Sequence, residues 1–146
     1  MTLTIRPIAI GDKPAWKPLW QAYLAFYETA LPDAVHDVTF ARLTSPDHPA
    51  QNGLLALQDG QATGLVHVIY HPHNWRIEPV CYLQDLYVAP DARNSGAGRA
   101  LIEAVYERAD QDGCPSVYWT TQDFNTTARR LYDRIGTLTP FIKYTR

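Results

Sequence analysis

DLYVAPDARNSGAGRAL, residues 85–101, is the most informative stretch of the chain. It begins within an apolar segment, Val80–Val88, that is expected to form a strand, and it continues through a short loop that holds Gly96 and Gly98. Apolar residues then recur at helical spacing until Gly113. The backbone N–H groups that begin a helix are free to bind an anion, and the helix dipole favours negative charge there. This pattern predicts a strand, a phosphate-binding loop and a helix in direct succession.

Two other phosphate-binding motifs do not fit these residues. A Walker A loop continues from its last glycine into Lys and then Ser or Thr, whereas Gly98 is followed by Arg99 and Ala100. A dinucleotide-binding loop has a third glycine three residues later, where this chain has Leu101. A tight turn that binds no ligand is the simpler alternative, and it stays open at this point. Arg93, at the mouth of the loop, is placed to add a charge-assisted bond to a phosphate.

The remaining chain divides into strand and helix patterns without a linker, a repeat or a low-complexity tract. The expected strands are 4–8, 53–57, 62–70, 80–88, 116–121 and 138–144. Four helices are expected. The first begins after the cap residue Asp12, and the second lies within residues 37–43. The third runs from Ala97 to before Gly113, and the fourth runs from Ala128 to Ile135 and is closed by Gly136. The order predicts an α+β protein with one mixed sheet, helices on both faces and a single domain over residues 1–146.

Composition argues against several classes of protein. The 146 residues are 46% hydrophobic and 19% charged, with a net charge of -2, which is typical of a globular domain. The sequence has no basic cluster for nucleic acid, no apolar run that could span a membrane and no signal-peptide pattern, so a cytoplasmic protein is expected. Cys81 and Cys114 lack the paired spacing of a disulfide framework or a zinc site. His67, His71 and His73 lack matching carboxylates, so no metal site is expected.

Asn125 and Tyr132 form a second group, in the last predicted helix. Asn125 is a favourable N-cap residue, and Tyr132 lies two helical turns further along, on the same side as the apolar stripe. Two interpretations of Tyr132 stay open, a tyrosine of the core or a phenol placed to donate a proton.

Together these two segments resemble the GNAT superfamily of N-acetyltransferases. Arg93-Asn94-Ser95-Gly96-Ala97-Gly98 matches that family's Arg/Gln-x-x-Gly-x-Gly/Ala loop, and the spacing of Asn125, Tyr132 and Gly136 is similar to that of the family's next helix. The resemblance implies a GNAT-like fold with a mostly antiparallel mixed sheet, and acetyl-CoA as the cosubstrate. The residues that it implies for binding acetyl-CoA are Leu86, Tyr87, Val88, Arg93, Asn94, Ser95, Gly96, Ala97, Gly98, Arg99, Asn125 and Tyr132.

Residues 118–121 and 140–144 are similar to a branch of that superfamily that includes yeast acetyltransferases of histone tails, polyamines and D-amino acids. Members of the branch tend to dimerise, so a homodimer is expected. Because their substrates vary widely, the acceptor is expected only to be an amine on a small molecule or a peptide.

The resemblance also implies direct attack of a neutral amine on the thioester. Tyr132 would protonate the leaving thiolate, and the Val88 N–H would bind the thioester carbonyl. Asp85 is the candidate base, with a carboxylate that is satisfied by the backbone or caps a helix as the alternative. Relatives that acetylate polyamines often have Glu where this chain has Gln84, which cannot accept a proton at neutral pH.

Tyr27, Glu28 and Asp85 are the candidate residues for binding the acceptor, because aromatic faces and carboxylates attract a cationic amine. A different class of function also stays open, a non-catalytic module that binds or senses acyl-CoA. Such a module would keep Arg93 and the two glycines of the loop but would have no use for the phenol of Tyr132.

Overall fold

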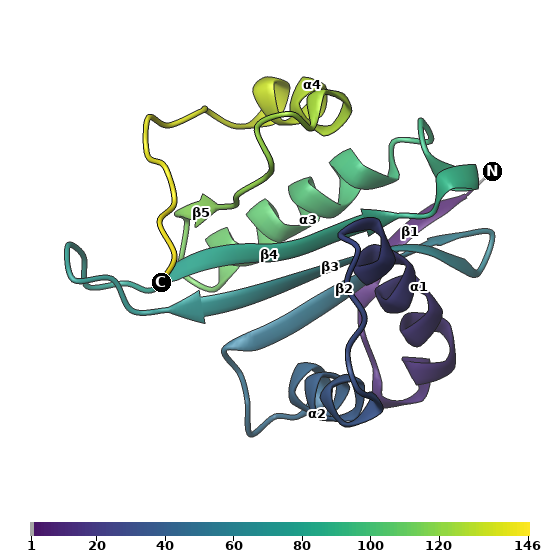
Figure 1. The fold of residues 1–146 in the computed structure, drawn as a ribbon. Coiled ribbons are helices and arrows are strands. Elements are labelled where there is room, and N and C mark those ends of the chain that lie inside the picture. The colour runs from purple at the N-terminus through teal and green to yellow at the C-terminus, as the bar shows by residue number, and fades with distance from the viewer. Residues whose placement is uncertain (1) are drawn as a thin grey trace.

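The computed structural model describes residues 2–146, which form one five-stranded sheet with its covering helices (Figure 1). The strands are β1 Leu3–Pro7, β2 Gln51–Gln58, β3 Gln61–His71, β4 Val80–Val88 and β5 Val117–Tyr118. The helices are α1 Lys13–Phe26, α2 Asp33–Thr44, α3 Ala97–Gln111 and α4 Thr126–Ile135, with short 3-10 turns η1 Ile10–Asp12 and η2 Pro90–Ala92.

The strands lie side by side in chain order, from β1 to β5. The first four pair antiparallel, and β5 joins β4 in parallel through the register pairs Cys81↔Val117 and Tyr82↔Tyr118. The turn between β2 and β3 has Asp59 and Gly60 at positive φ, as expected for an Asp-Gly hairpin. The prediction of a mixed, mostly antiparallel sheet is confirmed.

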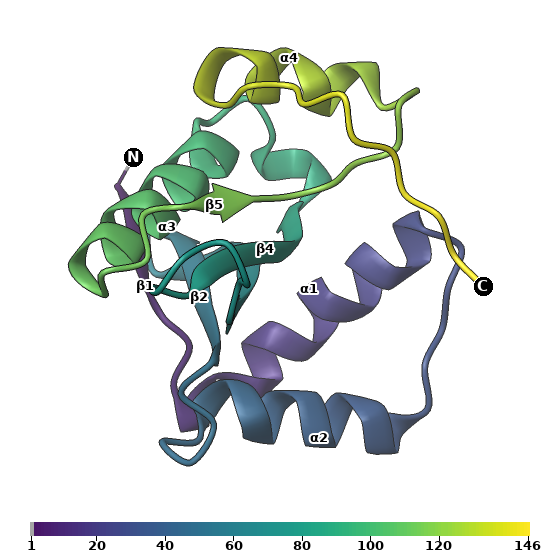
Figure 2. The same cartoon turned by 90° about the vertical axis from the view of Figure 1, so that its left-hand side faces the viewer.

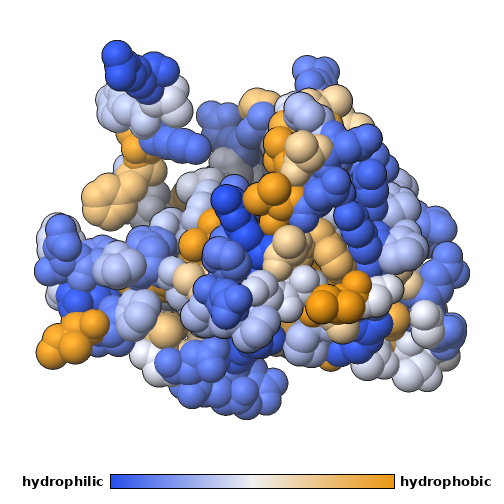
Figure 3. Space-filling model, turned by 90° about the horizontal axis from the view of Figure 1, so that it is seen from below, coloured by the Kyte–Doolittle hydropathy of each residue, from blue (hydrophilic) through white to orange (hydrophobic). Residues whose placement is uncertain are grey.

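Helices cover both faces of the sheet, as predicted (Figure 2). Helices α3 and α4 lie on one face, where α3 packs on Leu54, Val66 and Leu83. Helices α1 and α2 lie on the opposite face around Trp16, which is fully buried. Truncating a buried tryptophan typically costs about 3–5 kcal/mol. Seen from the side of α2, the surface is mostly hydrophilic, with apolar groups in small separate patches (Figure 3).

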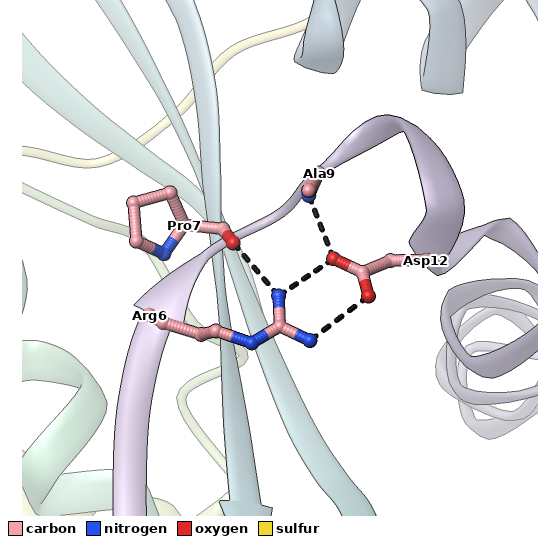
Figure 4. A network of polar contacts seen from close by, with 4 residues as sticks. All are labelled: Arg6, Pro7, Ala9 and Asp12. Carbon is pink, nitrogen blue, oxygen red and sulfur yellow. Dashed lines mark hydrogen bonds and ion pairs between the residues drawn. The ribbon is translucent and has the colours of Figure 1, made fainter.

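An ion pair holds the junction between β1 and α1 (Figure 4). Arg6 donates to both Asp12 oxygens, at 2.7 and 2.9 Å, and the Ala9 N–H donates to Asp12 Oδ2 at 2.7 Å. Asp12 stands at the N-cap position of α1 as predicted, but its carboxylate does not cap that helix, because Arg6 and Ala9 occupy it. Hydrogen bonding to Arg6 lowers the pKa of Asp12. The stability that this pair contributes at neutral pH is therefore lost as the pH falls through the lowered pKa.

The predicted strand over residues 138–144 is wrong, because residues 137–146 contain neither strand nor helix. Leu138, Phe141, Ile142 and Tyr144 are instead exposed by 73%, 82%, 76% and 87%. The preceding strand, β5, also covers only Val117–Tyr118 and not the expected residues 116–121. An alternating sequence forms a strand only where a neighbour supplies backbone partners, and β5 is too short to supply them.

The two cysteines, Cys81 and Cys114, are both buried and free. Within residues 2–146, no three His, Cys, Asp or Glu side chains are grouped so that they could hold a metal ion. Across the same residues, no helix has the length and apolar character needed to cross a membrane.

Candidate active site

The loop that is predicted to bind phosphate joins β4 to α3. After η2, Asn94 and Gly96 have positive φ angles of 65° and 86°, and α3 begins at Ala97. The Ala100 N–H is the one that closes the first turn of the helix, at 2.9 Å from the Gly96 oxygen. The N–H groups before it have no partner within the helix and remain free at its N-terminus.

The two glycines leave the backbone of this loop uncovered. A Cβ on Gly96 would meet no atom within 4 Å, and the positive φ of this residue favours glycine. A Cβ on Gly98 would make ordinary contacts, 3.6 Å from Leu131 Cδ2 and 3.8 Å from Val88 Cγ2. The Ser95 hydroxyl donates to a carbonyl of η2 and so stabilises the turn. The backbone of the loop is therefore open to close approach by a ligand.

Arg93, in the loop, and Arg99, in the first turn of α3, lie differently. Arg93 Nε donates to the Val88 carbonyl at 3.1 Å, and the guanidinium carbon lies 5.9 Å from the centre of the Tyr87 ring. This bond uses Nε and not the Nη groups, so Arg93 is anchored beside the loop with its terminal donors available. Arg99 pairs along α3 with Glu103, at 2.7 Å. Of the two, Arg93 is the better placed to bind an anion.

The edge of β4 that faces β5 is unpaired over most of its length. Pairing ends at Tyr82↔Tyr118, where β5 also ends. At the far end of β4, the Ala89 N–H donates to the Thr63 carbonyl, on the side of β3, at 2.8 Å. Because successive N–H groups of a strand alternate in direction, the Val88 N–H faces the opposite, unpaired edge. The predicted Val88 donor thus lies beside the loop between β4 and α3 and outside the sheet pairing.

A β-bulge at Gln84 sets the direction of Asp85. Consecutive residues of β3, His67 and the one after it, pair with Asp85 and Leu83, so Gln84 is an extra residue of β4. Leu83 before the bulge and Leu86 after it both pack on the α3 face. Asp85 therefore lies with His67 on the α1 face. Without the extra residue, strict alternation would turn Asp85 to the α3 face.

Asp85 is buried, with 6% exposure, and a histidine binds its carboxylate. His67 Nδ1 lies 2.9 Å from Asp85 Oδ2, and Nε2 of the same ring lies 2.9 Å from Nε1 of Trp16. The centres of the Trp16 and Trp20 rings are 6.0 and 5.0 Å from the centre of the imidazole. Asp85 thus neither caps a helix nor relies on the backbone, which were the alternatives to a role in the site.

Tyrosines of α1 and β4 gather beside this carboxylate. Tyr23 stacks on Trp20 with ring centres 5.4 Å apart, and it meets Tyr27 and Tyr87 edge-on at 5.2 and 6.3 Å. Burial and then the charge of Asp85 raise the pKa of Tyr23. Burial and the same charge also raise the pKa of Tyr27. Both phenols stay protonated at neutral pH, next to a negative charge.

Glu28 does not join this group. Helix α1 ends at Phe26, and Glu28 lies beyond it, exposed and at a positive φ of 55°. Its N–H donates to the Ala25 carbonyl at 2.9 Å and closes the turn. Of the three residues predicted to bind the acceptor, Tyr27 and Asp85 are brought together, while Glu28 serves the turn after α1.

Helix α4 packs Tyr132 against the part of the core that α3 covers. The Tyr132 ring packs edge-on against Trp119, with centres 5.5 Å apart. Burial, and then the nearby Tyr27, raise the pKa of Tyr132 to about 12, so its phenol is protonated at neutral pH. Asn125 stands at the N-cap position of α4 as predicted, but its side chain accepts no capping bond from the helix. Its Nδ2 instead donates to Thr121 Oγ1 at 3.3 Å.

The sequence pattern did not assign Trp16 or His67 to the site. His67 stood out only as one of three nearby histidines, and the structure separates them. His71 Nε2 lies 2.7 Å from the hydroxyl of Tyr118, whereas His67 lies in the buried cluster beside Asp85. The cross-strand pairing of His67 with Asp85 would have indicated that their side chains meet. This pairing depends on a bulge that cannot be predicted from the sequence pattern.

Comparison with known proteins identifies the family of this chain. Residues 16–137 match the model of the acetyltransferase (GNAT) family. The chain belongs to the GNAT family. It is 39% identical over 145 residues to the D-amino-acid N-acetyltransferase HPA3 of Saccharomyces cerevisiae. The aligned region covers 99% of this chain and 90% of that protein. It is 27% identical over 123 residues to the aminoglycoside N(6')-acetyltransferase type 1 of Salmonella typhimurium, spanning 82% of this chain and 78% of that protein.

Solved structures share the GNAT fold. The enzyme AAC(6')-Iy, in complex with a bisubstrate analogue that contains CoA, superposes with a TM-score of 0.87 at 21% identity, over 100% of this chain and 98% of that chain. A ribosomal-protein-alanine N-acetyltransferase from Brucella melitensis superposes with a TM-score of 0.83 at 21% identity, over 100% of this chain and 99% of that chain. This GNAT chain is therefore an enzyme, an N-acetyltransferase, and a non-catalytic sensing module is not favoured. GNAT enzymes use acetyl-CoA.

Proposed function

We propose that this GNAT enzyme transfers the acetyl group of acetyl-CoA to a primary amine by direct attack. The main support is that three features meet at β4: the free N–H groups before Ala100, the unpaired edge of the strand and the buried carboxylate of Asp85. The N-terminus of α3 and Arg93 would hold the pyrophosphate of acetyl-CoA. The thioester arm would then lie along the unpaired edge at Leu86 and Val88.

The residues at β4 and α4 suit each step of that reaction. The acceptor arrives as an ammonium ion, and Asp85 removes one proton, directly or through a water molecule. The nitrogen lone pair adds to the thioester carbonyl, whose developing negative oxygen accepts a hydrogen bond from the Val88 N–H. As the C–S bond breaks, Tyr132 gives its phenolic proton to the CoA thiolate. The nitrogen releases its second proton to water, and the products are the acetylated amine and CoA.

The surroundings of Asp85 favour a cationic acceptor. The carboxylate supplies the negative charge, and Tyr23 and Tyr27 supply aromatic faces and phenol groups beside it. Relatives are named for the acetylation of a D-amino acid, an aminoglycoside and, in Caenorhabditis elegans, thialysine. We infer that the acceptor of this chain is a primary amine on a small molecule or a peptide.

The test is the release of CoA thiol from acetyl-CoA by the purified protein, with one amine present at a time. The amines would be a D-amino acid, a polyamine, an aminoglycoside and a lysine-containing peptide. We expect release that depends on the amine and saturates with its concentration. Binding of acetyl-CoA in calorimetry, without release in the presence of any of these amines, would contradict the proposed reaction.

Tyr132→Phe is expected to lower turnover by about 10²-fold, at the low end for a general acid because a thiolate is a moderate leaving group. The affinity for acetyl-CoA, measured by calorimetry, should not change. Because burial raises the pKa of Tyr132 to about 12, the wild-type enzyme should not lose this proton donor at moderately alkaline pH. An unchanged turnover in the variant across the pH range would return Tyr132 to a purely structural role.

We also propose a homodimer that involves residues 138–144. Their apolar side chains are exposed, and β5, with one neighbour in the sheet, is an edge strand. Light scattering after gel filtration should give about twice the 16.5 kDa of one chain. Phe141→Asp should shift the mass toward the monomer, whereas Thr139→Asp, a matched change at a polar position of the same segment, should not. A monomeric wild-type protein at micromolar concentration would refute the dimer.

We keep three further predictions from the sequence as part of this proposal. They are a single domain over residues 1–146, a cytoplasmic location, and activity that needs no metal, nucleic acid or membrane.

A further inference from the structure

Trp16, His67 and Asp85 form a chain of hydrogen bonds whose direction follows from their chemistry. An indole N–H can only donate, so His67 Nε2, at 2.9 Å from Trp16 Nε1, accepts this bond with a lone pair. The proton of the imidazole is then on Nδ1, which donates to Asp85 Oδ2 at 2.9 Å. This network holds His67 as the neutral Nδ1–H tautomer.

We propose that His67 is a positioning residue of the acceptor site, which holds Asp85 by Oδ2 and so orients the carboxylate toward the acceptor amine. The inference rests on the proposed function of Asp85. His67 is only 2% exposed and acts through that carboxylate, not on the acceptor itself. Its other nitrogen is occupied by Trp16, so it cannot take up a proton without losing that bond. His67 thus orients the carboxylate and does not relay its proton.

The position of Asp85 explains why such a partner is needed. Asp85 directly follows the bulge at Gln84, where the regular ladder of β3 and β4 is interrupted. A hydrogen bond at one oxygen sets the rotation of the carboxylate, and the rings of Trp16 and Trp20 in turn hold the imidazole. The precision matters, because a displacement of about 1 Å at a reacting group can lower the rate about 10²-fold.

The tautomer is measurable without any substrate. Long-range correlation spectra of protein with ¹⁵N-labelled histidine report which ring nitrogens carry protons, and the His67→Gln variant assigns the signals of His67 by their loss. We expect a protonated Nδ1 and an unprotonated Nε2 at neutral pH. Trp16→Phe should shift the Nε2 signal, because it removes the donor to that atom. A protonated Nε2 in the wild-type protein, in either the neutral or the cationic ring, would overturn the proposal.

Kinetics of two His67 variants separate positioning from simple packing. The amide of His67→Gln can accept from Trp16 and donate to Asp85, whereas His67→Leu can do neither. We expect His67→Leu to lower kcat/KM for the amine by about 10²-fold and His67→Gln to recover most of this loss. Affinity for acetyl-CoA should stay at the wild-type value in both. Equal losses in the two variants, or a matching loss of acetyl-CoA affinity, would make His67 a structural residue and overturn the proposal.

Two further controls keep the result unambiguous. If His67→Leu does not fold, Trp16→Phe replaces it, with a raised KM for the amine and unchanged affinity for acetyl-CoA as the expected result. A wild-type kinetic profile in Trp16→Phe would then count against positioning. If no amine supports CoA release by the wild-type enzyme, the proposed function fails, whereas the spectra still decide the state of His67.

Discussion

Gly98→Glu is expected to abolish the binding of acetyl-CoA. A Cβ at this position makes ordinary contacts with Leu131 and Val88, at 3.6 and 3.8 Å, but a glutamate extends well beyond them. Its carboxylate would compete for the free N–H groups at the N-terminus of α3 and would repel the pyrophosphate. We expect the affinity in calorimetry to fall by at least about 10²-fold, equivalent to about 2.8 kcal/mol of binding free energy.

Gly98→Ala is the matched control for this prediction. Its methyl group fits between the same two neighbours, so acetyl-CoA should bind with nearly wild-type affinity. The glutamate variant should still fold, because a negative charge near a helix N-terminus is stabilising. Thermal denaturation of both variants checks this point. Wild-type affinity in Gly98→Glu would remove the loop from the binding site.

Asp85→Asn is expected to lower kcat/KM for the amine by about 10²–10⁴-fold at neutral pH, the usual contribution of a general base. The asparagine Oδ1 can still accept the hydrogen bond from His67, so the local geometry is preserved while the negative charge and the basic group are lost. The measurement is CoA release at saturating acetyl-CoA. Activity of the variant should recover as the pH approaches about 10.4, where a typical alkylammonium deprotonates without a base.

Asp110→Asn is the control for this second prediction. Asp110 is an exposed carboxylate of α3, and its replacement removes the same charge from the surface. We expect kcat/KM to stay at the wild-type value. A full wild-type rate in Asp85→Asn at neutral pH would show that the base is another group, and the acceptor site would then have to be placed elsewhere.

The local features of the site were predictable from the sequence. The junction expected in residues 85–101 is present, with β4 ending at Val88 and α3 beginning at Ala97. Gly96 adopts the positive φ that only glycine adopts without strain, and the residues after it have the apolar spacing of a helix. These features depend on sterics and hydrogen bonds between residues close in the chain, so the sequence alone could predict them. The family resemblance and the fold class are both confirmed by the comparisons.

The role of Gly136 and the conformation of residues 138–144 could not be predicted from the sequence, because both depend on residues distant in the chain. Gly136 ends α4 as expected, but its φ of -140° is extended, so a left-handed turn does not explain this glycine. A Cβ there would lie 2.9 Å from Trp119 Cη2, which means that close packing of a ring excludes a side chain. Residues 138–144 have a strand-like pattern, yet β5 offers no sufficient partner. Neither contact can be inferred from residue spacing.

The amino-acid sequence by itself determined the mixed sheet, the loop between β4 and α3, and the candidate residues Asp85 and Tyr132. Only the tertiary structure decided which of them meet, and it added Trp16 and His67. His67 and Asp85 are 18 residues apart, and they share a face because one extra residue, Gln84, reverses the alternation of β4. A strand pattern of period two does not reveal such an insertion, because a bulge exists only in relation to the partner strand.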